Sequence, residues 1–302
     1  MTFEKKNMPS ILLTGACGFV GSNIAARLIS DGYKHQCIDD LSFGNRENFK
    51  GNFSKIGFES LSESFLSAFD ILIHCATTNI IYAMDHPVQT FQNNATNTIK
   101  LFQKFKGKII YTSTASVYGQ ADIFPTPEDA EVRTNNSYDQ SKYISELFLQ
   151  QRGNYTTLRL SNVYGINQRP DNPFCGVIGR LVDNILNDKH INVNGQGTQT
   201  RDYTFVDDVV DAVITATIHK EALNTEINIA TGIETSIMGL MEMISDYTGK
   251  DPLYQQVEAR KIDGIFRRCL DIKKAERLLG WKPNNSLEEG IKKTISWMQN
   301  NK

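Results

Sequence analysis

The sequence lacks long hydrophobic runs and any strong excess of one charge. Its apolar stretches are much shorter than the roughly 20 residues that span a membrane, and the charged first ten residues lack the apolar core of a signal peptide. Lys and Arg number 32 against 34 Asp and Glu, so no basic field would gather nucleic acid. We therefore expect a cytoplasmic protein with no membrane and no nucleic-acid partner.

Cysteine is also scarce, and the cysteines are not spaced as closely placed pairs. The five cysteines are odd in number, widely spread and never arranged as Cys-x-x-Cys. That pattern argues against a disulfide framework and against a zinc site, so no metal site is predicted. Hydrophobic residues make up 40% and charged residues 22%, which is ordinary for a folded globular protein and excludes a disordered chain.

Short apolar runs alternate with helix-period segments through the first two-thirds of the chain. The expected strands are 11–14, 35–38, 71–75, 108–112 and 157–160, and the expected helices are 21–30, 90–105 and 137–151. This rhythm predicts an α/β protein with a doubly wound parallel sheet that is covered on both faces.

The rhythm breaks after Gly165. A loop rich in Asn, Pro and Asp leads to helices expected at 176–187 and 205–218 and a strand at 226–230, followed by helices at 237–248 and 287–299 with a basic, loop-like connection. We expect a large domain of residues 1–165 plus about 204–231. Residues 166–203 plus 232–302 would form a smaller C-terminal α/β lobe.

A glycine-rich turn follows the first expected strand and precedes a helix. In a dinucleotide site, Gly15 would permit the tight turn, Gly18 the approach of a pyrophosphate and Gly21 the close packing of helix on sheet. A glycine turn without a ligand is the alternative, but the strand–turn–helix context favours the cofactor. The candidate ligands are Gly15, Cys17, Gly18, Phe19, Val20 and Gly21.

Two carboxylates end the second expected strand. Asp39 and Asp40 follow Gly21 by 18 and 19 residues, close to the spacing of a carboxylate that binds an adenosine ribose. Asp39 is the better candidate because it directly follows the apolar pair Cys37-Ile38. A carboxylate there repels the 2′-phosphate of NADP, so the predicted cofactor is NAD; simple capping of a turn is the alternative.

A phenol and an ammonium group lie four residues apart in the expected helix 137–151. Tyr138 and Lys142 would share one helix face. A free Tyr has a pKa of about 10, which Lys142 and an oxidised nicotinamide would lower toward the range of a general base. Ser113 and Thr114 follow a strand at the edge where α/β sheets bind ligands. The alternative for Tyr138 and Lys142 is an ordinary pair on the helix surface. The alternative for Ser113 and Thr114 is capping of the strand end.

Taken in order, the motifs of this chain resemble those of the extended short-chain dehydrogenases/reductases of the nucleotide-sugar epimerase/dehydratase family. The resemblance extends nearly from end to end. The motifs are Gly15-x-x-Gly18-x-x-Gly21, Ile73-His74-Cys75-Ala76, Asn94, 113–119 (STASVYG), Tyr138-x-x-x-Lys142, 158–165 (LRLSNVYG), Arg201-Asp202-Tyr203 and Leu279-Gly280-Trp281-x-Pro283.

The resemblance implies a Rossmann-type NAD-binding domain and a lobe that binds a nucleotide-diphosphate sugar. Tyr138 would be the base, Lys142 its partner and a nicotinamide-ribose ligand, and Thr114 the partner of a substrate hydroxyl. The resemblance further implies cofactor contacts from Cys75, Ala76, Thr77 and Asn94, and substrate contacts from Ser113, Asn162, Arg201 and Arg260, with Lys261 as the alternative to Arg260. It also implies a homodimer formed through 90–105 and 137–151, whose apolar stripes could instead pack within one chain.

Ala115 and Ser116 stand where dehydratases and decarboxylases of the family usually carry an acidic residue. The predicted reaction is therefore 4-epimerisation of a nucleotide-diphosphate hexose through a transient 4-keto sugar, in carbohydrate biosynthesis. A 4-ketoreductase and a non-catalytic NAD-sensing protein are the alternatives. Asn194 replaces the aromatic residue often found in the base-binding strand, so the base is left open.

Overall fold

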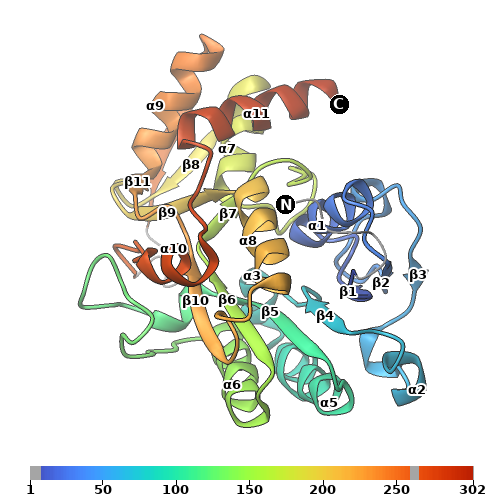
Figure 1. Cartoon of the computed structure of the whole chain (residues 1–302). Coiled ribbons are helices and arrows are strands. Elements are labelled where there is room, and N and C mark those ends of the chain that lie inside the picture. Colours follow the sequence, from blue (N-terminus) through green and yellow to red (C-terminus); the bar gives the residue numbers. More distant parts are fainter. Residues whose placement is uncertain (1–7, 259–264, 302) are drawn as a thin grey trace.

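The fold is organised around a seven-stranded sheet in which every strand runs parallel to its neighbours. The structure, a computed structural model, describes residues 8–258 and 265–301. The strand order is β10-β6-β5-β4-β1-β2-β3 (Figure 1). The strands are β1 (Ile11–Thr14), β2 (His35–Asp39), β3 (Ser54–Lys55), β4 (Ile71–His74), β5 (Lys108–Thr114), β6 (Tyr155–Leu160) and β10 (Thr225–Ile229). The predicted doubly wound α/β fold is confirmed.

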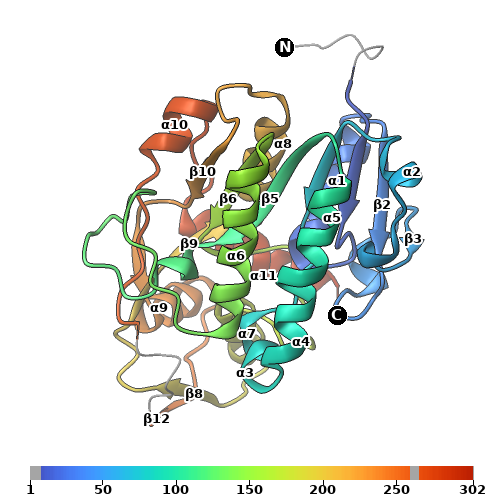
Figure 2. The ribbon, with the colours of Figure 1, turned by 90° about the horizontal axis from the view of Figure 1, so that it is seen from below.

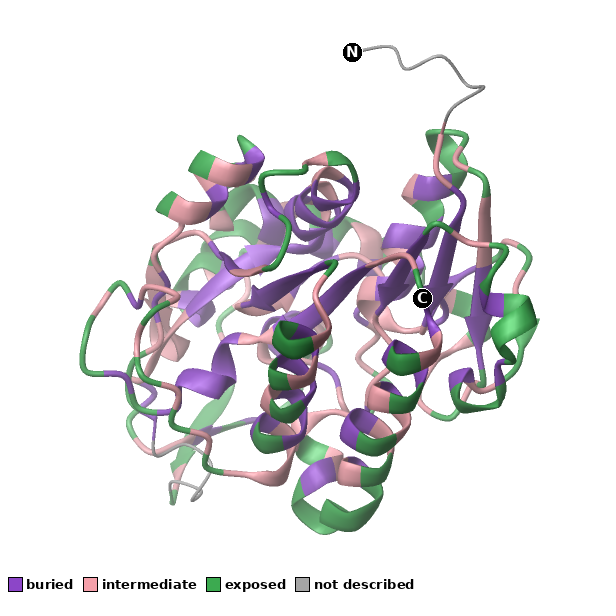
Figure 3. Ribbon diagram, turned by 60° about the horizontal axis from the view of Figure 1, so that its bottom comes forward, coloured by how far each residue is buried: buried purple, intermediate pink, exposed green. Residues whose placement is uncertain are grey.

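Helices cover both faces of this sheet (Figures 1 and 2). Helices α1 (Phe19–Ser30) and α8 (Val206–Ile218) cover one face, and α5 (Thr98–Lys104) and α6 (Ser137–Arg152) cover the other. Because strand side chains alternate between faces, Ile11 and Leu13 pack in the first core cluster and Leu12 in the second. Figure 3 shows the resulting burial of the central strands.

The helix expected at 90–105 is divided into three consecutive segments. It begins as α4 (Pro87–Phe91), continues through a π-helical stretch, η4 (Gln92–Asn97), and ends as α5; α3 (Ile80–Asp85) precedes it. A wider π turn commonly marks a functional region, and η4 contains Asn93, which faces the cavity described below.

Two further sheets lie outside the seven-stranded sheet. Strands β11 (Glu234–Ser236), β9 (Thr200–Phe205) and β7 (Asn162–Tyr164) form one sheet, and β12 (Tyr254–Val257) pairs with β8 (Ile191–Asn194) in the other. Their core also contains residues of α7 (Val177–Leu186), α9 (Ile237–Thr248) and α11 (Leu287–Asn300). The division into two lobes stays a prediction. Asn162 was expected in the large domain, but it lies in β7, which belongs to the three-stranded sheet.

The connection expected to be loop-like contains a further helix, α10 (Lys273–Leu279). Ala275, Leu279 and Trp281 pack into the core of the large sheet, and the Trp281 indole N–H donates to the Asp208 carbonyl at 2.9 Å. The C-terminal part of the chain therefore contributes to both cores. Short elements complete the fold: η2 (Arg46–Asn48), η3 (Phe58–Ser60), α2 (Glu63–Leu66) and η5 (Ala115–Tyr118).

Within residues 8–258 and 265–301, every helix falls short of the length and apolar content needed to traverse a bilayer.

Candidate active site

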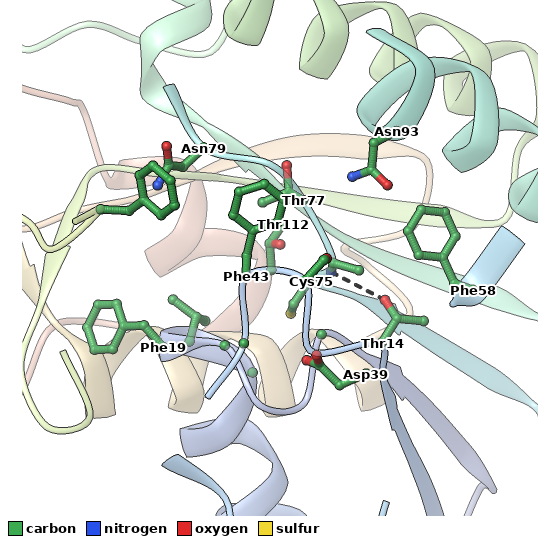
Figure 4. Close-up of a pocket in the computed structure, with 18 of the residues that line it drawn as sticks. Thr14, Phe19, Asp39, Phe43, Phe58, Cys75, Thr77, Asn79, Asn93 and Thr112 are labelled. Carbon is green, nitrogen blue, oxygen red and sulfur yellow. Dashed lines mark hydrogen bonds between the residues drawn. The ribbon is translucent and has the colours of Figure 1, made fainter. Parts of the chain in front are cut away.

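A cavity of about 390 Å³ opens at the carboxyl ends of β1, β2, β4 and β5. This edge is where open α/β sheets bind their ligands. Figure 4 shows side chains from separate segments, among them Phe19, Asp39 and Thr77, around the same space. Most predicted cofactor and catalytic residues line it: Gly15, Gly18, Phe19, Val20, Gly21, Asp39, Asp40, Cys75, Ala76, Thr77, Ser113, Thr114, Tyr138 and Lys142.

The glycine turn has the shape that a pyrophosphate requires. Gly15 has a φ of +75°, and a Cβ there would lie 2.7 Å from the backbone nitrogen of Ala76. A Cβ on Gly21 would lie 1.9 Å from the carbonyl oxygen of Gly15. Helix α1 begins at Phe19 without a side-chain cap at Gly18, so its first N–H groups can bind phosphate oxygens at the positive end of the helix dipole.

Asp39 is held in place for a ribose contact. Its carboxylate is 7% exposed and accepts the N–H groups of Cys17 and Leu41, each at 2.8 Å. Burial raises the pKa of Asp39, and these two backbone bonds oppose the rise. Asp40 also lines the cavity, but it is exposed and accepts the N–H and hydroxyl of Ser42. The Cys17 side chain is buried in the core and its N–H is bonded to Asp39, so a direct cofactor contact from Cys17 stays a prediction.

Asn94 lies behind the cavity wall. The buried amide accepts the N–H of Thr78 at 2.9 Å and donates to the Thr78 carbonyl at 3.1 Å. It therefore fixes the loop after β4, which supplies Cys75, Ala76 and Thr77 to the cavity. A direct cofactor contact from Asn94 stays a prediction, and its neighbour Asn93 lines the cavity instead.

Tyr138 and Thr114 meet at the inner end of the cavity. Tyr138 comes from the first turn of α6 and is hydrogen-bonded to the Thr114 hydroxyl at the end of β5. Burial raises the pKa of Tyr138 to about 12; Asp139 adds to the rise, while Thr114 and Arg268 oppose it. The expected lowering of this pKa by Lys142 and an oxidised nicotinamide stays a prediction; in the protein alone the cation that opposes the rise is Arg268.

Lys142 lies deeper than Tyr138. Its Nζ is 4.2 Å from the centre of the Tyr111 ring, and the side chain is 2% exposed. Burial lowers the pKa of Lys142 to about 7, with Cys75 and Glu146 opposing the shift. The ammonium group therefore lies in the cavity wall near Cys75. From there it could donate a hydrogen bond to a hydroxyl group of a bound ligand. Its contact with a nicotinamide ribose stays a prediction.

The hydroxyls that follow β5 have different partners. Ser113 donates to Glu146, which forms a buried ion pair with Arg159 at 2.7 Å. Thr114 instead lies 2.9 Å from the Ser116 hydroxyl, and Ser116 hydrogen-bonds the carboxylate of Asp139. The Ser113 hydroxyl is thus engaged inside the fold, whereas the Thr114 hydroxyl is directed to Tyr138 and the cavity.

A second cavity of about 230 Å³ lies between residues of β7, α7, β8 and β9. It brings together the predicted Asn162 and Arg201 with Tyr203 and Asn194. Asn162 Oδ1 and the Tyr203 hydroxyl are buried without a hydrogen-bond partner in the described part of the chain. Such orphaned polar atoms suit a polar ligand. Arg260 and its alternative Lys261 lie outside the described residues.

Arg268 lines neither cavity but lies close to residues of both, and the sequence analysis missed it. Its guanidinium interacts electrostatically with Tyr138, Asp139 and Arg201. Arg268 is 130 residues from Tyr138 in the sequence, and only the fold brings them together. The one available signal was the Arg267-Arg268 pair just before the Leu279-Gly280-Trp281 motif.

Comparison with known proteins places this architecture in a family. The model of the NAD dependent epimerase/dehydratase family matches residues 11–230. A Methanocaldococcus jannaschii protein is 34% identical, over 96% of this chain and 99% of its own length. The UDP-glucose 4-epimerase of Mycolicibacterium smegmatis is 31% identical, over 96% of this chain and 98% of its own.

Solved structures agree. The UDP-glucose 4-epimerase of Thermotoga maritima, solved with UDP-glucose, superposes with a TM-score of 0.88 at 32% identity, over 97% of this chain and 99% of that one. Other matches are a UDP-glucuronic acid decarboxylase and an NDP-hexosamine 5,6-dehydratase, so family membership is compatible with several reactions. The glycine turn, Asp39 and these relatives together show that the chain belongs to the NAD-dependent epimerase/dehydratase family of nucleotide-sugar enzymes.

Proposed function

We propose that the protein is a nucleotide-sugar 4-epimerase that interconverts the C4 epimers of a nucleotide-diphosphate hexose. The observation that carries the proposal is the hydrogen-bonded pair of Thr114 and Tyr138 with Ser116, not an acidic residue, beside it. The names of the M. smegmatis and T. maritima relatives support the same reaction. We also propose a homodimer as the working form.

In this proposal the second cavity binds the diphosphate, and the cofactor cavity holds the reacting part of the sugar. Asn162 and Arg201 would hold the diphosphate in the second cavity, because a guanidinium binds phosphate oxygens in pairs. Thr114 would hold the 4-hydroxyl, and Tyr138 would take its proton as C4 is oxidised. Bound NAD supplies the chemistry of accepting the C4 hydride and returning it. Rotation of the 4-keto sugar about its diphosphate anchor would present the opposite face to the same groups.

Dehydration and decarboxylation are less well supported. Elimination of water needs an acid beside the sugar, and residues 115 and 116 supply a methyl group and a hydroxyl. Asp139 acts electrostatically on Tyr138, but it follows Tyr138 in α6 instead of Thr114 in the chain, and its Oδ2 accepts the Asn136 amide at 2.6 Å, while Oδ1 is buried without a partner among the described residues. Epimerisation requires one group that exchanges a proton with the 4-hydroxyl, which is what Tyr138 provides.

Turnover with and without added cofactor tests this proposal. We expect the NAD-loaded protein to interconvert UDP-glucose with UDP-galactose, or UDP-glucuronate with UDP-galacturonate, without consuming added NADH. Stoichiometric oxidation of NADH with a 4-keto sugar would identify a reductase instead. Loss of water or CO₂ as the main reaction, or no interconversion of either pair, would overturn the proposal.

A further inference from the structure

The π-helical stretch η4 contributes one carboxamide group, that of Asn93, to the lining of the cofactor cavity. A chain of contacts places it near Phe58 of η3. The ring centres of Phe58 and His74 are 4.9 Å apart, and His74 Nε2 lies 3.1 Å from the Thr98 hydroxyl. That hydroxyl donates to the backbone carbonyl of Asn93 at 3.0 Å. Phe58 also lines the cavity, and Figure 4 shows it on the same side as Asn93.

The Asn93 carboxamide is held in one orientation by Asn94. Oδ1 of Asn94 accepts the Thr78 N–H at 2.9 Å, and its Nδ2 donates to the Thr78 carbonyl at 3.1 Å, so its two amide atoms are distinguished. Nδ2 of Asn93 donates to the same Asn94 oxygen at 3.0 Å. Turning the Asn93 amide over would bring two oxygens together, because neither can donate. Oδ1 of Asn93 accepts no hydrogen bond from the described residues, so it is available to a ligand in the cavity.

The strand order determines which part of NAD reaches Asn93. Strand β1, which leads into the glycine turn, lies between β4 and β2. Thr114, the hydrogen-bond partner of Tyr138, ends β5 on the β4 side, whereas Asp39 and residues 56–58 follow β2 and β3 on the other. With its pyrophosphate at the turn, NAD therefore places the nicotinamide on the first side and the adenosine on the second. With the ribose at Asp39, the adenine extends toward residues 56–58.

The part of the cavity around Phe58 is otherwise mainly apolar. Residues 56–58 contribute two apolar side chains and a glycine to the lining. Glu59 follows them, but its side chain is exposed and lies outside the lining. Each carboxylate oxygen of Asp39 already accepts a backbone N–H. Adenine carries a 6-amino group that donates hydrogen bonds, and Oδ1 of Asn93 is a side-chain acceptor beside Phe58 that can receive one.

We infer that Asn93 accepts a hydrogen bond from the 6-amino group of the NAD adenine, so that the site selects its dinucleotide by the base as well as by the ribose. Asn94 acts as a positioning residue, since it fixes which end of the Asn93 amide faces the cavity. Hypoxanthine carries an oxygen in place of the 6-amino group. Two acceptors would then face each other, and a site built to bind a donor rejects a ligand that lacks it.

Cofactor binding to the full chain, freed of any copurified dinucleotide, tests this inference independently of the reaction that the enzyme catalyses. Calorimetry should show NAD binding about tenfold or more tightly than nicotinamide hypoxanthine dinucleotide. Asn93→Ala should weaken NAD by about tenfold and leave the hypoxanthine dinucleotide nearly unchanged. Asn93→Leu keeps the volume of the side chain without its polar atoms, so it should lose the preference as well.

Asn79→Ala is the matched control, because it removes a carboxamide from the other side of the same cavity (Figure 4). Glu59→Gln is the second control, because it neutralises the carboxylate that follows Phe58. Both variants should keep the preference of the parent protein for NAD.

Equal affinity of the parent protein for the two dinucleotides would overturn the inference without any variant. A preference that survives in both Asn93 variants would assign the 6-amino group to another acceptor and overturn it as well. Loss of the preference in Glu59→Gln would identify that other acceptor as Glu59. Equal weakening of both dinucleotides by Asn93→Ala would make Asn93 a support of the cavity wall and would also contradict its contact with the base.

Discussion

The Ser116 hydroxyl lies 2.9 Å from the Thr114 hydroxyl, and Thr114 is in turn hydrogen-bonded to Tyr138. Ser116 also bonds Asp139, so four residues form one connected polar group at the inner end of the cofactor cavity. Two members of this group, Thr114 and Tyr138, line the cavity, and Tyr138 carries the more acidic hydroxyl. This arrangement is the structural basis for proposing a proton-exchanging epimerase.

Removal of the Tyr138 hydroxyl should abolish turnover but not cofactor binding. Tyr138→Phe keeps the ring and loses the general base, whose contribution is typically about 10²- to 10⁴-fold in rate. We expect kcat to fall by about that factor while NAD affinity, measured by calorimetry, changes little. Wild-type turnover in this variant would remove Tyr138 from the mechanism.

The pH dependence should report Tyr138 as well. The protein alone raises the pKa of Tyr138 to about 12, and only the deprotonated phenol can accept a proton. kcat/KM should therefore rise with pH across the neutral and alkaline range up to the pKa of the NAD-loaded enzyme. The oxidised nicotinamide should shift the midpoint below that of the protein alone. A kcat/KM that falls as the pH rises from about 6 to about 8 would contradict this role.

Asp39 and Asp40 offer a matched pair for testing cofactor choice. The Cys17 and Leu41 N–H groups bond separate oxygens of Asp39, so Asp39→Asn keeps an acceptor for only one of them and removes the charge that repels a 2′-phosphate. We expect the preference for NAD over NADP to drop by about 10- to 100-fold, the worth of a hydrogen bond to a charged group. Asp40→Asn alters an exposed carboxylate that bonds only Ser42 among the described residues. An equal effect from both substitutions would refute the assignment of Asp39.

The glycine turn should tolerate no side chain at Gly21. A Cβ there would lie 1.9 Å from the Gly15 carbonyl oxygen, and backbone atoms would have to move. Overpacking costs about 1–3 kcal/mol, so Gly21→Ala should weaken NAD binding roughly tenfold or more. Gly239→Ala, in helix α9 of the other lobe, serves as the control. Unchanged affinity in Gly21→Ala would mean that the turn does not set the pyrophosphate position.

The outer face of α6 should mediate dimerisation. Ile144 and Leu147 are 41% and 39% exposed there, and Val88 at α4 is 75% exposed. Leu147→Glu would place a charge in a dimer seam and should convert a particle of twice 34.0 kDa into one of 34.0 kDa by light scattering. Ile29→Glu alters an equally apolar exposed position on α1 and should have no effect. A wild-type protein that is monomeric would contradict the proposal directly.

Local signals were sufficient for the sheet and the cofactor turn. The strand expected at 226–230 is found as β10 (Thr225–Ile229), and helix 237–248 has the predicted bounds, because alternating and helical apolar periods are set by a few neighbouring residues. The turn from Gly15 to Gly21 was identifiable because its steric demands are local as well.

Long-range relationships could not be obtained in this way. The effect of Arg268 on Tyr138, the π-helical stretch before α5 and the role of Asn94 behind the cavity wall all depend on tertiary packing. The expected influence of Lys142 on the Tyr138 pKa followed from helical spacing alone, but the burial of Lys142 against Tyr111 draws the ammonium group inward. Side-chain direction over such distances requires the fold.

The fate of a deuterium at C4 tests the central claim most directly. UDP-glucuronate and UDP-glucose, each labelled at C4, would be incubated with NAD-loaded protein in ordinary water without added NADH, and the products analysed by NMR and mass spectrometry. A 4-epimerase returns the hydride that it removed, so the C4 epimer should retain the label and form more slowly than from unlabelled substrate. An unlabelled epimer, or no epimer until NADH is supplied, would contradict epimerisation at C4.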